Sequence, residues 1–177
     1  MILLTGMKKI ATLFITIFLM IAMSSNVILA QNKRLPYKLS VVIDENTVYK
    51  EDIKATSYVL PNNTIQLYPG ENIYLEVELT GGVIKNMNAV EENRNPSKTV
   101  VISFTQTVSN KTHKSMLLKI MNPFKEKLFY SAAIFLMQQK KWGNTDVYPV
   151  EAEKYSFESW PDIITSITLA EWSFKSK

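Results

Sequence analysis

The residue types that drive most enzyme chemistry are scarce in this sequence of 177 residues. It contains no cysteine, which excludes a thiol nucleophile and a thiolate metal site. Its single histidine, His113, is flanked by Lys111 and Lys114, whose charges disfavour both a protonated imidazole and a bound cation. The five glycines form neither a Gly-x-Ser-x-Gly elbow nor a phosphate-binding loop. We therefore predict that the protein is not an enzyme and that His113 is a surface residue without a catalytic role.

Paired carboxylates are the remaining groups with catalytic potential, because glycoside hydrolysis requires two of them across a cleft. Candidates by type alone occur in three places, namely Glu76 and Glu78, Glu91 and Glu92, and Glu151, Glu153 and Glu158. The first pair falls on the polar side of an amphipathic segment, and the others fall in polar segments, where acidic side chains keep a protein soluble. A glycoside hydrolase is therefore the least favoured hypothesis.

Calcium is the metal that the remaining oxygen donors suit best. The turns Asp44-Glu45-Asn46 and Glu91-Glu92-Asn93 carry carboxylate and amide oxygens of the kind that Ca²⁺ prefers. No Asp-x-Asp-x-Asp pattern arranges them into a binding loop. We expect no cofactor, and Ca²⁺ is a minor alternative.

Aromatic side chains crowd the last third of the chain and are the more informative set. Exposed tryptophan and tyrosine rings stack on sugars and anchor protein partners, so the candidate ligand-binding residues are Trp142, Trp160, Trp172 and Tyr148. The alternative is that the same rings fill one end of a hydrophobic core. The position of Trp160 before Pro161, at a corner of the chain, favours packing.

The elements that position these residues are β-strands, because apolar side chains after residue 37 repeat with a period of two. Turn residues interrupt the pattern roughly every 8–12 positions, which is typical of a β-sandwich. We predict an all-β fold, a two-sheet antiparallel Ig-like sandwich formed by one domain over residues 31–177, with a closed barrel as the alternative. The main predicted strands span 37–43, 55–60, 64–68, 73–80, 83–90, 98–108, 116–121, 127–137 and 163–174.

The apolar run Leu128–Met137 is the longest outside the N-terminus. It is too short to cross a membrane as a helix, and Pro123 and Gly143 bound it. We predict that it forms the central strand of the core. The polar stretch Glu151–Glu158 is predicted to be a loop.

The first thirty residues have the three-part layout of a secretory signal peptide. Lys8 and Lys9 precede an apolar run from Ile10 to Ala22, and Ala30 suits the cleavage position. Cleavage there leaves no membrane anchor, and the absence of cysteine excludes a lipoprotein anchor. The two lysines supply half of the formal net charge of +4, so the remaining chain is close to neutral and lacks the basic patch of a nucleic-acid-binding protein.

The segment from Lys114 to Phe174 resembles small secreted bacterial Ig-like β-sandwich proteins of unknown function. The similar motifs are Lys114–Phe124, Leu128–Ala132, Trp142 with Pro149, and Glu158–Pro161 before a closing apolar strand. The resemblance implies an exported β-sandwich and transfers no functional residue.

The expected function is that of an exported, non-enzymatic module, periplasmic or secreted, which binds a protein partner in the cell envelope. Its basis is a β-rich fold whose exposed edges could accept a partner strand. The first alternative is a carbohydrate-binding module that uses exposed tryptophans. The sequence leaves the identity of the partner, protein or glycan, and the oligomeric state open.

Overall fold

The fold was analysed in a computed structural model that describes residues 33–174. These residues belong to one compact unit, which begins at Lys33. The predicted signal peptide, residues 1–30, lies outside the described residues and stays a prediction.

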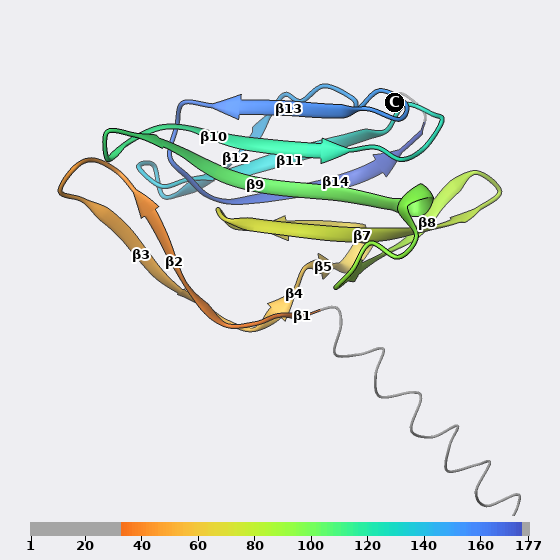
Figure 1. Cartoon of the computed structure of the whole chain (residues 1–177), viewed down its shortest axis with the longest axis horizontal. Coiled ribbons are helices and arrows are strands. Elements are labelled where there is room, and N and C mark those ends of the chain that lie inside the picture. The colour runs from red at the N-terminus through yellow and green to blue at the C-terminus, as the bar shows by residue number, and fades with distance from the viewer. Residues whose placement is uncertain (1–32, 175–177) are drawn as a thin grey trace, which may run out of the picture. The chain divides into compact units, whose positions relative to one another are not determined.

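Two antiparallel five-stranded sheets form a β-sandwich that is not closed into a barrel, as predicted (Figure 1). Sheet I has the strand order β13-β10-β9-β7-β8 and consists of β7 (Glu71–Thr80), β8 (Val83–Val90), β9 (Thr99–Ser109), β10 (Thr112–Met121) and β13 (Tyr155–Trp160). Sheet II has the order β12-β11-β14-β6-β5 and consists of β5 (Val59–Leu60), β6 (Thr64–Leu67), β11 (Phe129–Leu136), β12 (Lys141–Thr145) and β14 (Ile164–Ser173).

Four further strands lie outside the two sheets. The hairpin of β2 (Tyr37–Val42) and β3 (Val48–Ile53) reaches along one end of the sandwich in Figure 1. A short pair joins β1 (Lys33–Arg34) to β4 (Thr56–Ser57). Two single-turn 3₁₀ helices, η1 (Pro61–Asn63) and η2 (Pro96–Lys98), precede β6 and β9.

Side chains along each strand point alternately to its two faces, and those on the inner faces of the two sheets form the core between them. Val100, Ile102 and Phe104 of β9 are buried, as are Met116, Leu118 and Ile120 of β10. A second, smaller cluster beneath the hairpin contains Leu39, Val41, Ile53 and Ile163. Burial of these alternating side chains is what holds the strands in register.

Several boundaries differ from the predictions. The stretch Glu151–Glu158, expected to be a loop, contains most of strand β13. Strand β11 is second from the edge of sheet II, and β14 occupies its centre. Leu79, expected to face inward, is exposed because the pairing of β7 with β8 shifts register after Glu78.

Candidate functional site

Trp142 is the exposed tryptophan of the predicted set, with 45% of its surface accessible. It lies on β12 opposite Phe135 of β11, and the two rings meet edge to face with centroids 5.5 Å apart. Beside them is an open recess of about 330 Å³ floored largely by small side chains, including Ser131, Ala133 and Thr168. The recess offers hydroxyl groups and an exposed ring, which are features suited to a sugar.

The other three predicted residues have different surroundings. Trp172 is buried, and its ring stacks on Tyr130 at 5.3 Å, so it presents no free face to a ligand. Trp160 packs against the core, and its Nε1 donates a hydrogen bond to Thr145 Oγ1 at 2.9 Å. Tyr148 is exposed. The structure therefore does not assemble the four residues into one aromatic platform.

The candidate carboxylates are not arranged for glycoside hydrolysis. Glu76 and Glu78 are two residues apart on β7 and point from the same face of one strand, rather than toward each other across a cleft. Glu151 pairs with Lys127 at 2.7 Å, and Glu158 accepts a bond from the Tyr148 backbone. Within residues 33–174, no three acidic or histidine side chains converge as metal ligands would.

His113 has a structural role that its polar surroundings did not predict. It lies on β10 rather than in a turn. Its Nδ1 is 2.8 Å from Gln106 Nε2, and its Nε2 is 3.0 Å from the Pro161 carbonyl oxygen. An amide nitrogen donates and a carbonyl oxygen accepts, so these contacts suit Nδ1 as the acceptor and Nε2 as the donor. Both ring nitrogens are thus engaged.

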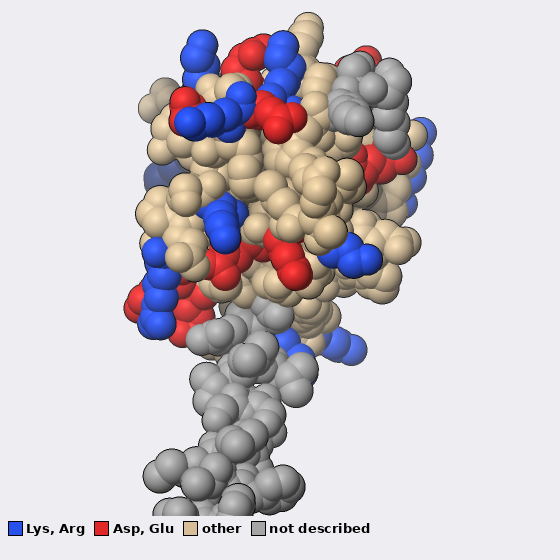
Figure 2. All heavy atoms as spheres, turned by 90° about the vertical axis from the view of Figure 1, so that its right-hand side faces the viewer, with Lys and Arg blue, Asp and Glu red and all other residues tan. Residues whose placement is uncertain are grey.

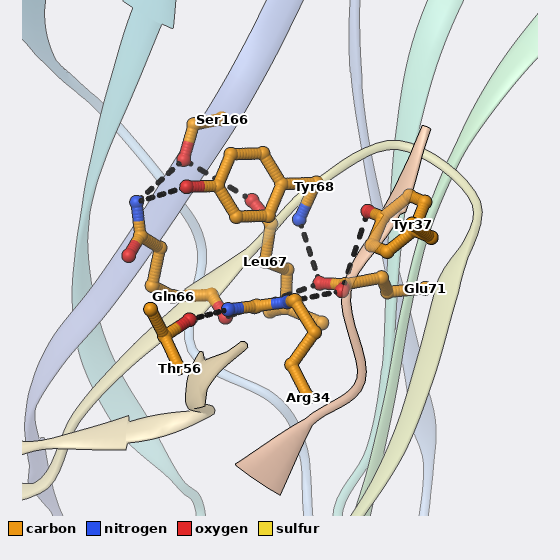
Figure 3. A network of polar contacts seen from close by, with 8 residues as sticks. All are labelled: Arg34, Tyr37, Thr56, Gln66, Leu67, Tyr68, Glu71 and Ser166. Atoms are coloured by element: carbon orange, nitrogen blue, oxygen red, sulfur yellow. Dashed lines mark hydrogen bonds and ion pairs between the residues drawn. The ribbon is translucent and has the colours of Figure 1, made fainter. Parts of the chain in front are cut away.

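A buried ion pair anchors the start of the described chain (Figure 3). The guanidinium of Arg34 on β1 binds both carboxylate oxygens of Glu71 on β7. It also donates to Thr56 Oγ1 at 2.7 Å and to the Gln66 carbonyl oxygen at 2.8 Å. Only 1% of Arg34 and 7% of Glu71 are exposed. The network explains how a two-residue strand is held on the domain.

Aromatic rings complete this network and keep water from it. The Arg34 guanidinium lies between the rings of Tyr58 and Tyr68, at 4.5 and 4.7 Å from their centroids. Burial lowers the pKa of Arg34, but the bond to Glu71 and its charge raise the pKa more, so it stays above its ordinary value. Burial and the Glu71 charge also raise the pKa of Tyr37, whose hydroxyl donates to Glu71. All these groups are engaged with one another, so the network is a structural one.

Side-chain amides cover two strand edges that would otherwise be open to pairing. Asn63 Oδ1 accepts a hydrogen bond from the backbone N–H of Met87 on β8. Gln106 bonds to both the N–H and the carbonyl of Val42 on β2, at 2.9 and 2.6 Å. Each amide imitates a neighbouring strand, and such blocking suppresses edge-to-edge association.

The edges on the opposite side of the sandwich are bridged to each other. Trp160 of β13 bonds to Thr145 of β12, and Glu158 of β13 accepts the N–H of Tyr148, just beyond β12. These contacts join β12 and β13, the edge strands of the two sheets on that side of the sandwich.

The outer face of sheet I is unusual because apolar side chains cross it. A single row, here called the outer row, contains one residue from each of the five strands in register: Tyr155, Met121, Val101, Tyr74 and Val90. Four of them adjoin a buried core residue in their strands and so point away from the core, where they are half-buried, whereas Tyr155 is exposed. The solvent side of an antiparallel sheet is normally polar, so this row indicates a binding surface.

An aromatic and basic cluster stands at the β13 end of this face. Phe157 and Tyr155 have 60% and 55% of their surfaces exposed. Between them lies the ammonium group of Lys119, at 4.3 Å from the Tyr155 centroid and 5.8 Å from that of Phe157. We call these three residues the aromatic knob. Large rings with a cation held at their faces are frequent anchors of protein interfaces.

An acidic recess opens at the other end of the same face. It has a volume of about 300 Å³ and is lined by Glu76, Val77, Glu78, Asn88, Asn95 and Lys98. Figure 2, which looks onto one end of the domain, shows acidic and basic side chains interspersed rather than gathered by sign. In the recess itself, two carboxylates accompany one ammonium group.

Comparisons of the chain with protein-family models, curated proteins and solved structures found no match. The resemblance to small secreted bacterial proteins therefore stays a prediction. In the described part of the chain, no helix has the length and apolar character needed to cross a membrane.

Proposed function

We propose that the protein is a non-enzymatic binding module that engages a protein partner through the outer face of sheet I. The observation that carries this proposal is the outer row, which places apolar side chains of five adjacent strands on the outer face of the sheet, with Tyr155 exposed and the other four half-buried. Protein interfaces have apolar centres and polar rims. The outer row, with the aromatic knob at one end and polar side chains around it, has that composition.

The face supports binding better than the edges on which the sequence-based hypothesis relied. The amides of Asn63 and Gln106 occupy backbone groups of β8 and β2. Side chains bridge the β12 and β13 edges. A partner strand added to β8 or β2 would compete with these amides for the backbone groups, whereas docking on the outer row would not.

Export, and with it action in the cell envelope, is part of the proposal. Its support is the signal-like sequence of residues 1–30. An Ig-like relationship is likewise proposed. Its support is a two-sheet sandwich in which strands distant in sequence, such as β6 and β14, become neighbours.

The test is affinity capture from envelope extract followed by crosslinking to the immobilised protein. We expect a specific protein to be retained by the wild type and by Val48→Ser, and to be lost from Phe157→Ser. Val48 is exposed on the separate hairpin and is the matched control, because both substitutions remove an exposed apolar side chain. Equal retention by all three proteins, or by none, would contradict binding through this face.

Carbohydrate binding is the second candidate, and the exposed ring of Trp142 beside its recess favours it. Stacking of a sugar on this ring would change its fluorescence. We expect a saturable change on titration with a cell-wall or plant glycan, absent in Trp142→Ala. Unchanged fluorescence across a panel of glycans would exclude this function for Trp142.

A further inference from the structure

We propose that the partner of sheet I is a second copy of this chain, so that the protein forms a two-fold symmetric dimer. This inference rests on the proposed function and names its partner. It follows from two features of one face, the aromatic knob and the acidic recess, which are complementary in shape and charge but cannot meet within one molecule.

The separation of the two features follows from the strand register. Lys119 is paired with Ser103, and Ser103 with Asn72, so two strand spacings separate Lys119 from β7. Glu78 lies six residues further along β7. With about 4.8 Å between strands and 3.4 Å per residue, Lys119 and Glu78 are roughly 20 Å apart on the same face.

A two-fold axis brings the features together twice. In an isologous interface the same patch is used by both copies, so each knob lies over the recess of the other copy. The point midway between Lys119 and Glu78 falls over β9 near Val101. The axis therefore passes through the middle of the outer row, and its apolar side chains form the centre of the interface.

Shape and charge both favour this arrangement. The recess is open and, at about 300 Å³, has room for one aromatic side chain such as that of Phe157. Its carboxylates, Glu76 and Glu78, outnumber its ammonium group, Lys98. Lys119 forms no ion pair with any residue of the range 33–174 and contacts aromatic rings instead. The recess of a second copy would supply the missing carboxylates.

The size of the face sets the expected strength. Five strands at about 4.8 Å and about six residues at 3.4 Å along each give a patch of roughly 24 by 20 Å, or on the order of 500 Å² per copy. The total of about 1,000 Å² is at the lower limit for a specific interface. We therefore expect a reversible dimer with a dissociation constant on the order of 10–100 μM.

Charge reversal tests the pairing directly. Sedimentation velocity of the wild type between about 1 and 500 μM should show a concentration-dependent shift from monomer to dimer. Lys119→Glu alone and Glu78→Lys alone should each weaken dimerisation by at least about tenfold, because each places two like-charged pairs in a symmetric interface. An equimolar mixture of the two variants should recover the wild-type affinity, because every pair is then of opposite sign.

The matched control is Val48→Ser, which should dimerise as the wild type does, whereas Phe157→Ser should not. A monomer at every concentration would overturn the inference, as would a mixture of the reversed variants no tighter than either alone. If that monomer still captured an envelope protein through Phe157, the proposed function would survive and the dimer would not. The full pattern of loss and recovery cannot arise from misfolding, because two misfolded variants do not restore each other.

Discussion

Replacement of Arg34 by alanine should destabilise the domain more than any surface substitution, because it leaves Glu71 as a buried carboxylate without its counter-charge. Removing one partner of a buried ion pair typically costs about 3–5 kcal/mol. The guanidinium also donates charge-assisted bonds to Thr56 and the Gln66 carbonyl, whose loss adds about 1.5 kcal/mol each. Glu71 keeps two donors, the Tyr68 N–H and the Tyr37 hydroxyl, which reduce the penalty. We therefore expect a loss of about 4 kcal/mol in the free energy of unfolding.

Equilibrium unfolding in urea, followed by tryptophan fluorescence, measures this loss. For a domain of this size, about 4 kcal/mol corresponds to a midpoint lowered by about 2 M urea. The matched control is Lys38→Ala, which breaks the exposed ion pair with Asp52. Exposed pairs contribute at most about 1 kcal/mol, so the control midpoint should remain close to that of the wild type.

The double variant Arg34→Met/Glu71→Leu separates the missing counter-charge from lost packing. It removes both charges and keeps apolar volume between the tyrosine rings, so it should be more stable than Arg34→Ala. Equal instability of the two variants would refute the account given for the single substitution. So would a loss below about 1 kcal/mol for Arg34→Ala, since the ion pair would then not be holding β1 in place.

Three further substitutions test other parts of the structure. Burial, with the charge of Glu158, raises the pKa of the Tyr130 hydroxyl. Above pH about 10 the unfolded chain loses this proton while the folded chain keeps it, so the free energy of unfolding should fall as the pH rises. Urea titrations at a series of pH values should show a shallower fall for Tyr130→Phe. Gln106→Ala frees both backbone groups of Val42 and should accelerate hydrogen exchange in the β2–β3 hairpin by about tenfold, as read by mass spectrometry; unchanged exchange would show that the hairpin is held by packing alone. Asn63→Ala should open the edge of β8 and so increase aggregation, as measured by light scattering. If the variant protein aggregated no more than the wild type, this amide would not be protecting the edge.

The core strands could be predicted from sequence because their periodicity carries the information. Val100, Ile102 and Phe104 alternate with polar or exposed positions, as do Ile73, Leu75 and Val77, and all six are buried. The paired strands β5 and β6, joined by Pro61–Asn63, also lie within the predicted strands 55–60 and 64–68. In both cases the decisive interactions are local or strictly periodic, so they are visible in a single sequence.

Strand β13 was missed because its burial is opposite to the usual pattern. Its large rings, Tyr155 and Phe157, face solvent, and its small or acidic residues, Ser156 and Glu158, alternate with them. The period of two was present, but the polar composition of the stretch from Glu151 onward indicated a loop. A search for alternation irrespective of which face is apolar would have found the strand, and with it the aromatic knob.

The Arg34 network could not be predicted for a different reason. Its central pair joins residues 37 positions apart, and the tripeptide Asn32-Lys33-Arg34 looks like an ordinary charged stretch. Whether an arginine is buried depends on partners that only the tertiary fold brings together. No local propensity distinguishes Arg34 from Lys33, although one is buried and the other exposed.

The same tertiary arrangement explains why one mode of association is blocked while another stays open. Exposed strand edges promote indiscriminate pairing, because any extended backbone can satisfy their N–H and carbonyl groups. Side-chain amides reduce that option at β8 and β2, where they bond to backbone groups of Met87 and Val42. A side-chain surface such as the outer row is selective, because its partner must match both the row and the charges at its ends. A sandwich that exposes Phe157 and Tyr155 on one face therefore favours partners of complementary shape, and the dimer proposed above would supply one in the acidic recess of a second copy.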